Sequence, residues 1–174
     1  MYPINSKIEG LILLLHFWMH IQSMKVLILI RHAHALPGHI ARVNSDALRP
    51  LSEEGRQKAK QTASLLTQKN VRPEIVLSSP LLRAVQTAEI IAQTWRLPVQ
   101  QSSELNGLYS DEEVVAFLRA QLENYDTLAA VTHNPSITYV NQLLCKQLKF
   151  FAPGSFSILQ MEKDCSARLL DFGE

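Results

Sequence analysis

The chain has 174 residues, of which 47% are hydrophobic and 19% charged, and its formal net charge is +1 at pH 7. This length and composition are those of one globular domain with its own core, and they exclude a disordered or collagen-like chain. The near-zero charge, with no stripe of like charge, excludes nucleic-acid binding by bulk electrostatics. With six glycines and neither G-x-x-x-x-G-K nor G-x-G-x-x-G, any bound phosphate must be held by side chains.

The first 23 residues are predicted to lie outside the fold, and residues 24–174 to form the domain. Residues 10–21 read GLILLLHFWMHI, which matches the apolar part of a signal peptide in length but is too short to span a bilayer as a helix. No net positive charge precedes this segment, and no A-x-A-like cleavage site follows it. We therefore expect no stable membrane span. Two interpretations remain open: an extension upstream of a translation start at Met24, or a membrane-associating helix.

From Lys25 onward, short apolar runs alternate with amphipathic segments, which is the pattern of a layered α/β domain. The run 26–30 (VLILI) has no polar interruption, as expected of a strand buried on both faces of a sheet. Ser52 is expected to cap a helix that ends near Gln68, and a second strand is expected over 74–78. This alternation predicts a three-layer α/β/α fold with a mostly parallel central sheet.

The next helix is predicted to have Ser79 as its N-cap and Pro80 as its first residue. Apolar residues at the helical period predict one buried stripe, made of Leu81, Val85, Ala88, Ala92 and Trp95. Arg83 lies off this stripe in the first turn, where a cation faces the positive end of the helix dipole at a cost of about 0.3–1 kcal/mol. That cost predicts an anion beside Arg83, either a bound ligand or a surface glutamate.

The rest of the chain continues the alternation and closes with two strands. The predicted elements are a short strand around Val99, a helix that opens with a capping box at 110–113, a strand over 128–132, a helix from Asn134 to about Lys146, and an antiparallel hairpin of 155–161 and 167–172.

Three buried strands end in polar residues that a buried strand does not need. Arg31 and His32 follow the first strand, Ser79 and Arg83 follow the second, and His133 follows the 128–132 strand. In open α/β sheets, ligands bind outside the carboxyl ends of the strands, so these side chains are expected to share one pocket. Guanidinium groups match phosphate oxygens, and a neutral imidazole can attack phosphorus. The set therefore indicates phosphoryl chemistry without a metal or other cofactor.

These residues lie in motifs that resemble the histidine phosphatase superfamily, also called phosphoglycerate mutase-like. The motifs are Arg31-His32-Ala33, the stretch 78–88 (SSPLLRAVQTA) and Thr132-His133-Asn134. The stretch 48–55 (LRPLSEEG) further resembles the short SixA-type branch, the phosphohistidine phosphatases. The similarity extends from Met24 nearly to the end of the chain. It implies the phosphoglycerate mutase-like form of the α/β/α fold.

Carried over by position, the resemblance implies that His32 is the nucleophile that becomes phosphorylated. Arg31 and Arg83 would bind the phosphoryl oxygens, and His133 would stabilise the group in transfer. Ala33 stands where much of the family has glycine. Many members also use an acidic residue to protonate the leaving oxygen, and Glu104 lies near the expected place, although an imidazole leaving group can dispense with a strong acid.

Two readings from other functional classes are open. His32, His34 and His39 have the spacing of a metal-binding loop, but the stretch HAHALPGH supplies no carboxylate of the kind that two-metal hydrolases use. His34 is then a rim residue and His39 a solvated loop residue. The second reading is a module that binds phosphorylated partners without hydrolysis, for which the two arginines alone would suffice.

The spacing of the motifs bears on the substrate. His32, Arg83 and His133 are separated by 51 and 50 positions, which leaves no room for the insertions that cover small substrates in the mutases of this family. We expect an open groove that admits a phosphohistidine on a partner protein, such as a signalling phosphotransfer domain, with a small phosphomonoester as the alternative substrate. Two cysteines are too few for a disulfide framework, so we expect a cytoplasmic location. We also expect a monomer.

Overall fold

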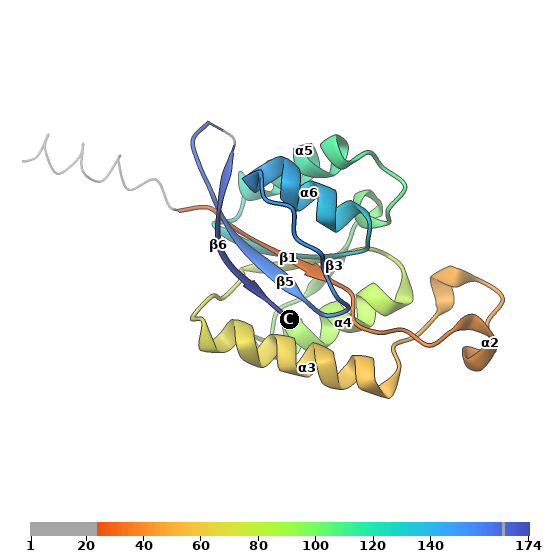
Figure 1. Ribbon diagram of the computed structural model, residues 1–174. Helices are drawn as coiled ribbons and strands as arrows, with labels where there is room; N and C mark the ends of the chain where they lie inside the picture. The colour runs from red at the N-terminus through yellow and green to blue at the C-terminus, as the bar shows by residue number, and fades with distance from the viewer. Residues whose placement is uncertain (1–23, 165) are drawn as a thin grey trace, which may run out of the picture.

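The computed structural model describes residues 24–164 and 166–174, which form a six-stranded sheet with helices on both faces (Figure 1). The strands are β1 (Val26–Arg31), β2 (Ile75–Ser78), β3 (Val99–Gln101), β4 (Thr127–Thr132), β5 (Phe156–Met161) and β6 (Ala167–Gly173). The α-helices are α2 (Gly38–Ala41), α3 (Glu53–Gln68), α4 (Leu82–Gln93), α5 (Asp111–Leu122) and α6 (Ser136–Cys145). Two short 3-10 helices are η1 (Asp46–Leu48) and η2 (Ser103–Leu105).

The order of strands in the sheet is β3-β2-β4-β1-β5-β6. The pairs β2/β3, β2/β4 and β1/β4 are parallel, whereas β5 pairs antiparallel with both β1 and β6. Parallel strands joined through helices direct their carboxyl ends to one edge of the sheet. The predicted α/β/α fold, with its mostly parallel sheet and closing antiparallel hairpin, is confirmed.

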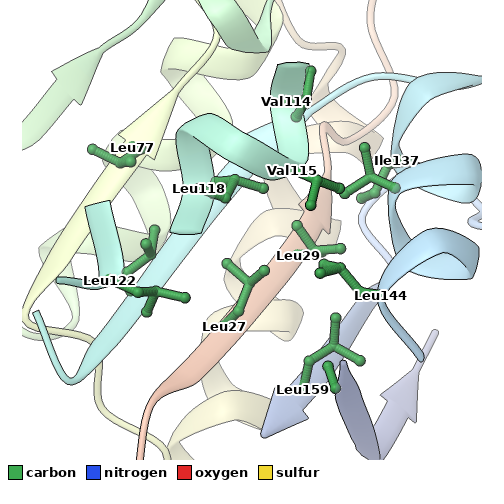
Figure 2. Close-up of a cluster of buried hydrophobic side chains, with 14 of the residues drawn as sticks. Leu27, Leu29, Leu77, Val114, Val115, Leu118, Leu122, Ile137, Leu144 and Leu159 are labelled. Carbon is green, nitrogen blue, oxygen red and sulfur yellow. The ribbon is translucent and has the colours of Figure 1, made fainter. Parts of the chain in front are cut away.

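Each face of the sheet has its own hydrophobic core. On one face, β1 leucines such as Leu27 and Leu29 pack with Leu118 and Leu122 of α5 and Leu144 of α6 (Figure 2). On the opposite face, alternate residues of the same strands pack against α3 and α4, including Ile28, Ile30, Leu66, Ala88 and Ile91. Both sets of β1 side chains are at most 1% exposed. This double burial explains why the strand carries no polar residue before its end.

Helix α4 differs from its prediction at its start and on its buried face. It begins at Leu82, and Leu81 is the N-cap without a side-chain cap hydrogen bond, so Ser79 and Pro80 precede the helix. The buried residues are Arg83, Ala84, Thr87, Ala88, Ile91 and Ala92. The small side chains of Ala84, Ala88 and Ala92 pack in the core on this face of the sheet, whereas the bulkier Trp95 packs at its edge and Val85 is half-buried. Arg83 is therefore on the buried face, contrary to the prediction.

The other predicted elements agree with the structure to within a few residues. Ser52 caps α3 through the backbone N–H of Gly55, and Ser110 and Glu113 form the predicted capping box of α5. The extension predicted for residues 1–23 lies outside the described residues. In the part of the chain that the structure describes, no helix is long and apolar enough to cross a membrane.

Candidate active site

The structure brings together the four side chains that the sequence predicts as a site. Arg31 ends β1 and His32 follows it, Arg83 lies in the first turn of α4, and His133 follows β4. Nε of Arg83 lies 3.3 Å from Nε2 of His32, and the ring centroids of His32 and His133 are 4.9 Å apart. All four side chains therefore meet at the edge of the sheet to which the parallel strands direct their carboxyl ends.

The backbone at His32 is held by the neighbouring strands and by α4. Its N–H donates to the carbonyl of Thr132 at 3.0 Å, and the N–H of Gly154 donates to the carbonyls of Arg31 and His32. The N–H of Ala33 donates to Oγ1 of Thr87 at 3.1 Å. These bonds hold the backbone from which the imidazole projects.

The imidazole of His32 has a defined tautomer and is neutral. Its Nδ1 lies 2.7 Å from the carbonyl oxygen of Ala33, which can only accept, so Nδ1 carries the proton. Nε2 then carries the lone pair. Burial lowers the pKa of His32 to about 4, and the positive charges of Arg83 and Arg31 add to this effect, whereas the hydrogen bond to Ala33 opposes it. At neutral pH, His32 therefore presents an unprotonated Nε2, which is the form that a nucleophile requires.

The guanidinium of Arg83 is only 9% exposed, and its nitrogens have partners on two sides. Nε donates toward Nε2 of His32, NH1 donates to the backbone carbonyl of Asp46 at 2.9 Å, and NH2 forms a 3.0 Å ion pair with Oδ2 of Asp46. The anion that the sequence predicts beside Arg83 is thus a side chain of the protein, an aspartate of η1.

Arg31 reaches the site from β1. Its NH1 donates to the carbonyl of Phe151 at 2.7 Å, and Nδ2 of Asn134 donates to the same oxygen. Its Nε is buried and has no hydrogen-bond partner among the described residues. Burial lowers the pKa of Arg31 from its ordinary value, and an arginine in a protein keeps its charge at neutral pH. Arg31 therefore offers a cation with unused donor capacity beside His32.

His133 is 6% exposed and contacts Ser79. Its Nε2 lies 2.7 Å from Oγ of Ser79, and its Nδ1 is buried without a partner within the described ranges. Burial lowers the pKa of His133 to about 3, and the nearby charges of His32 and Arg83 lower it further. The hydroxyl of Ser79 thus contacts His133 and also accepts from the backbone N–H of Leu81 at 3.3 Å, although α4 itself begins only at Leu82. A buried ring nitrogen without a partner can hydrogen-bond to a ligand in the pocket.

Other residues considered from the sequence have hydrogen-bond partners outside the set of Arg31, His32, Arg83 and His133, or are exposed. The carboxylate of Glu104 accepts hydrogen bonds from the hydroxyls of Ser102 and Ser103, and the bond from Ser102 is the main reason why its pKa is lowered. Nδ1 of His34 lies 2.8 Å from Oγ of Ser52, and His39 is exposed on α2, where we predict a loop. Among the described residues, no three His, Cys, Asp or Glu side chains are grouped so that they could hold a metal ion.

Sequence reasoning missed Asp46 and the carbonyl of Phe151. Asp46 is 37 positions from Arg83 and lies in a loop with no regular pattern, so no signal in the sequence identifies it. The carbonyl of Phe151 is a backbone group, and its place beside Arg31 depends on how the segment after α6 returns to β5.

Comparisons with known proteins agree with this geometry. The model of the histidine phosphatase superfamily (branch 1) matches residues 27–110. The phosphohistidine phosphatase SixA of Escherichia coli is 33% identical over 104 residues, which are 58% of this chain and 65% of SixA. A 2,3-bisphosphoglycerate-dependent phosphoglycerate mutase of Bifidobacterium longum is 37% identical over 83 residues, which are 46% of this chain and 34% of the mutase.

A solved structure of the protein histidine phosphatase SixA in complex with tungstate is also similar, with a TM-score of 0.76 and 25% identity. The similarity covers 84% of this chain and 95% of that chain. The curated relatives match over only part of their length, about a third for the mutase and 65% for SixA. The family model, the SixA relative and this structure agree with the resemblance of the motifs: the chain is similar to the histidine phosphatase superfamily, and its fold is phosphoglycerate mutase-like.

Proposed function

We propose that this protein is a metal-independent phosphatase in which His32 is transiently phosphorylated. The observation that carries the proposal is the arrangement of His32 between two contacts. Nδ1 is occupied by the carbonyl of Ala33, while Nε2 faces the guanidinium of Arg83 at 3.3 Å. The unprotonated nucleophile and a cation that can bind the phosphoryl oxygens are thus adjacent before any substrate arrives. The similarity to the histidine phosphatase superfamily supports the same activity.

In the first step, the lone pair of Nε2 of His32 attacks phosphorus. The Nε2–P bond forms while the bond between phosphorus and the leaving atom breaks, and the leaving group keeps that electron pair and takes up a proton from solvent. Arg83 and Arg31 bind the equatorial oxygens, and Nδ1 of His133 is available to donate to one of them.

In the second step, water attacks the phosphohistidine. A P–O bond forms, the P–Nε2 bond breaks, and the electron pair returns to Nε2 of His32. One proton of the water passes to solvent, and orthophosphate leaves. Because both steps pass through the same trigonal phosphoryl group, the same two arginines and His133 serve each of them.

We further infer that the substrate is a phosphohistidine on a partner protein. The connections around the site are short, since β3 ends at Gln101 and α5 begins at Asp111 with only η2 between them. Two apolar residues close in sequence to groups that bind the site arginines are exposed: Leu48 (56%), in η1 with Asp46, and Phe150 (76%), next to Phe151. Exposed apolar side chains beside charged site residues suit a protein surface better than a small ion. The relatives named as phosphohistidine phosphatases support the same substrate class.

A small phosphomonoester is the second candidate. The similarity to a phosphoglycerate mutase, whose name specifies small phosphorylated substrates, favours it. In that case the open site would accept many substrates, each with low affinity.

Parallel assays distinguish the two candidates. One measures phosphate release from a helical-bundle protein phosphorylated on an exposed histidine, and the other measures release from p-nitrophenyl phosphate. Fast release from the protein with slow turnover of the ester supports the first candidate, and the reverse supports the second. Anion binding without turnover of either substrate would instead indicate a phosphate-binding module and contradict the phosphatase.

Chelation provides a separate test of the metal-independent step. Activity is expected to be unchanged after treatment with EDTA, whereas a loss that zinc restores would contradict the proposal. The remaining parts of the proposal are a monomer, a cytoplasmic location and a role in phosphotransfer signalling. They rest on the small number of cysteines and on the protein substrate, and gel filtration and cell fractionation test them.

A further inference from the structure

The side chain and the backbone of Asp46 both bind the guanidinium of Arg83. The backbone carbonyl accepts from NH1 at 2.9 Å, and Oδ2 pairs with NH2 at 3.0 Å. The edge of Arg83 that carries NH1 and NH2 is therefore directed at Asp46. Nε, on the other edge, is directed at Nε2 of His32. Asp46, which is not one of the residues that follow the strands, thus contacts Arg83 in a way that sets the orientation of its guanidinium.

The carboxylate of Asp46 is itself held by a second arginine. Oδ1 pairs with NH1 of Arg49 at 2.8 Å, and Nε of Arg49 donates to the carbonyl of Leu36 at 2.8 Å. The hydrogen bond with Arg49 is the main reason why the pKa of Asp46 is lowered, so the carboxylate is charged at neutral pH. Arg49 therefore fixes the carboxylate in the position from which it binds Arg83.

The segment that carries Asp46 is otherwise held weakly. Residues 37–49, which we call the 37–49 loop, contain α2 and η1, and neither helix has a buried residue. A single β-bridge between Ala35 and Leu51 and a hydrogen bond from Leu36 to Pro50 close the base of the loop. The 37–49 loop has no core of its own, so the ion pair of Asp46 with the buried Arg83 contributes little to the stability of the fold. The pair is better suited to orienting Arg83.

Binding of a substrate phosphoryl group would replace the partner of Nε of Arg83 but leave the partners of NH1 and NH2 unchanged. To reach Nε2 of His32, the group must replace the contact from Nε of Arg83, which frees that edge for the phosphoryl oxygens. The opposite edge stays on Asp46. At the same time, the negative charge of Asp46 lies next to the bound anion and opposes its retention.

We propose that Asp46 is a positioning residue that turns Arg83 toward the phosphoryl group and speeds the release of orthophosphate. The inference rests on the proposed phosphatase activity. It predicts opposite effects on two quantities when the carboxylate is removed. Chemistry slows because Arg83 is no longer oriented, while orthophosphate binds more tightly because a competing negative charge is gone.

The test compares Asp46→Asn, which keeps the size of the side chain, with Asp46→Glu, which keeps its charge. Asp164→Asn is the matched control, because Asp164 is an exposed aspartate in the turn between β5 and β6, at the far end of the sheet from His32. Steady-state turnover of p-nitrophenyl phosphate gives kcat and KM. Calorimetry gives the affinity for orthophosphate, and circular dichroism confirms that each variant is folded.

Asp46→Asn is expected to lower kcat by about 10- to 100-fold and to tighten orthophosphate binding by about 3- to 10-fold. Asp46→Glu should recover part of kcat, and Asp164→Asn should match the wild type. Unchanged kcat in Asp46→Asn would overturn the proposal. Weaker orthophosphate binding together with lower kcat would also overturn it, because it would mean that Asp46 shapes the whole pocket.

If the wild-type protein hydrolyses neither substrate, the proposed phosphatase activity is contradicted. The effect of Asp46 on Arg83 can still be tested in that case. Calorimetry with orthophosphate then decides, together with the NMR signal of the Arg83 Nε–H group. Tighter binding and a shifted, faster-exchanging Nε–H signal in Asp46→Asn support the orientation of Arg83 by Asp46. No change in either measurement contradicts it.

Discussion

The imidazole rings of His32 and His133 lie with their centroids 4.9 Å apart and their planes inclined by 54°. Each ring is near enough for a proton on one to disfavour a proton on the other, and the charge of His32 is one reason why the pKa of His133 is low. Burial contributes most for both rings. The folded protein therefore contains a pair of neutral histidines beside two arginines.

Folding stability is expected to decrease as the pH falls from 7 to 5. The pKa values of about 4 for His32 and about 3 for His133 lie below the ordinary value of 6.5, so the unfolded chain takes up protons that the folded chain does not. Urea unfolding at pH 7, 6 and 5 measures this. The double variant His32→Asn and His133→Asn should show a flatter dependence over that range. Equal slopes for the variant and the wild type would contradict the two lowered pKa values.

His32→Ala is expected to abolish the phosphoenzyme and to lower kcat by about a thousandfold or more, because it removes the unprotonated nitrogen that lies beside Nε of Arg83. The measurement is acid-labile phosphate trapped on the protein after mixing with substrate. His39→Ala is the matched control, since His39 is exposed on α2. Phosphate trapped at wild-type levels in His32→Ala would place the nucleophile elsewhere.

Arg83→Lys is expected to lower kcat by about 100-fold although the charge is kept. A lysine cannot direct one edge at His32 and the other at Asp46, as the planar guanidinium does. Steady-state kinetics with p-nitrophenyl phosphate would show the loss. Arg168→Lys on β6, where the arginine is exposed, serves as the control. If kcat of Arg83→Lys stays within threefold of wild type, the positive charge at this position is sufficient and the shape of the guanidinium is not needed.

Glu104→Gln is expected to leave kcat within about threefold of wild type with a phosphohistidine substrate. The hydrogen bond from Ser102 lowers the pKa of Glu104, and a carboxylate that stays ionised is a poor proton donor. Initial rates from pH 6 to 8 test this. A loss of about 100-fold, with a basic limb that disappears in the variant, would instead identify Glu104 as the general acid.

Ser79→Ala is expected to destabilise the fold by about 1–3 kcal/mol, because Nε2 of the buried His133 loses its hydroxyl partner and the backbone N–H of Leu81 loses its acceptor. Thermal unfolding measures the loss. Ser103→Ala is a suitable control, since Ser103 is exposed. A variant as stable as wild type would show that His133 finds another partner, and its kcat would then show whether the ring has moved.

The sequence predicts the layers of the fold and the four basic side chains of the site for the same physical reason. A strand buried on both faces reads as a continuous apolar run, so the polar residue that ends it stands out, as Arg31 and His133 do. The start of α4 could not be predicted in this way. A serine followed by proline has the form of a helix cap, and only the tertiary contact with His133 shows that the hydroxyl of Ser79 is used differently.

Asp46 escaped prediction for a related reason. Its two arginine partners come from its own loop and from α4, and the second contact depends on how residues 37–49 fold back over the site. Local propensity and periodicity carry no information about such a contact. Loop residues such as Asp46 have partners that are distant in sequence, so they could be identified only from the structure.

The place of β1 in the sheet has a consequence for biosynthesis. β1 is the first described strand to be synthesised, yet it pairs with β4 on one side and with β5 on the other. On the ribosome, its two edges remain open until residues 127–132 and 156–161 have emerged. Open strand edges bind other chains, so nascent or truncated forms that lack β5 are the species most prone to aggregate. The candidate active site forms at the same late moment, because the backbone of His32 is held by Thr132 and Gly154.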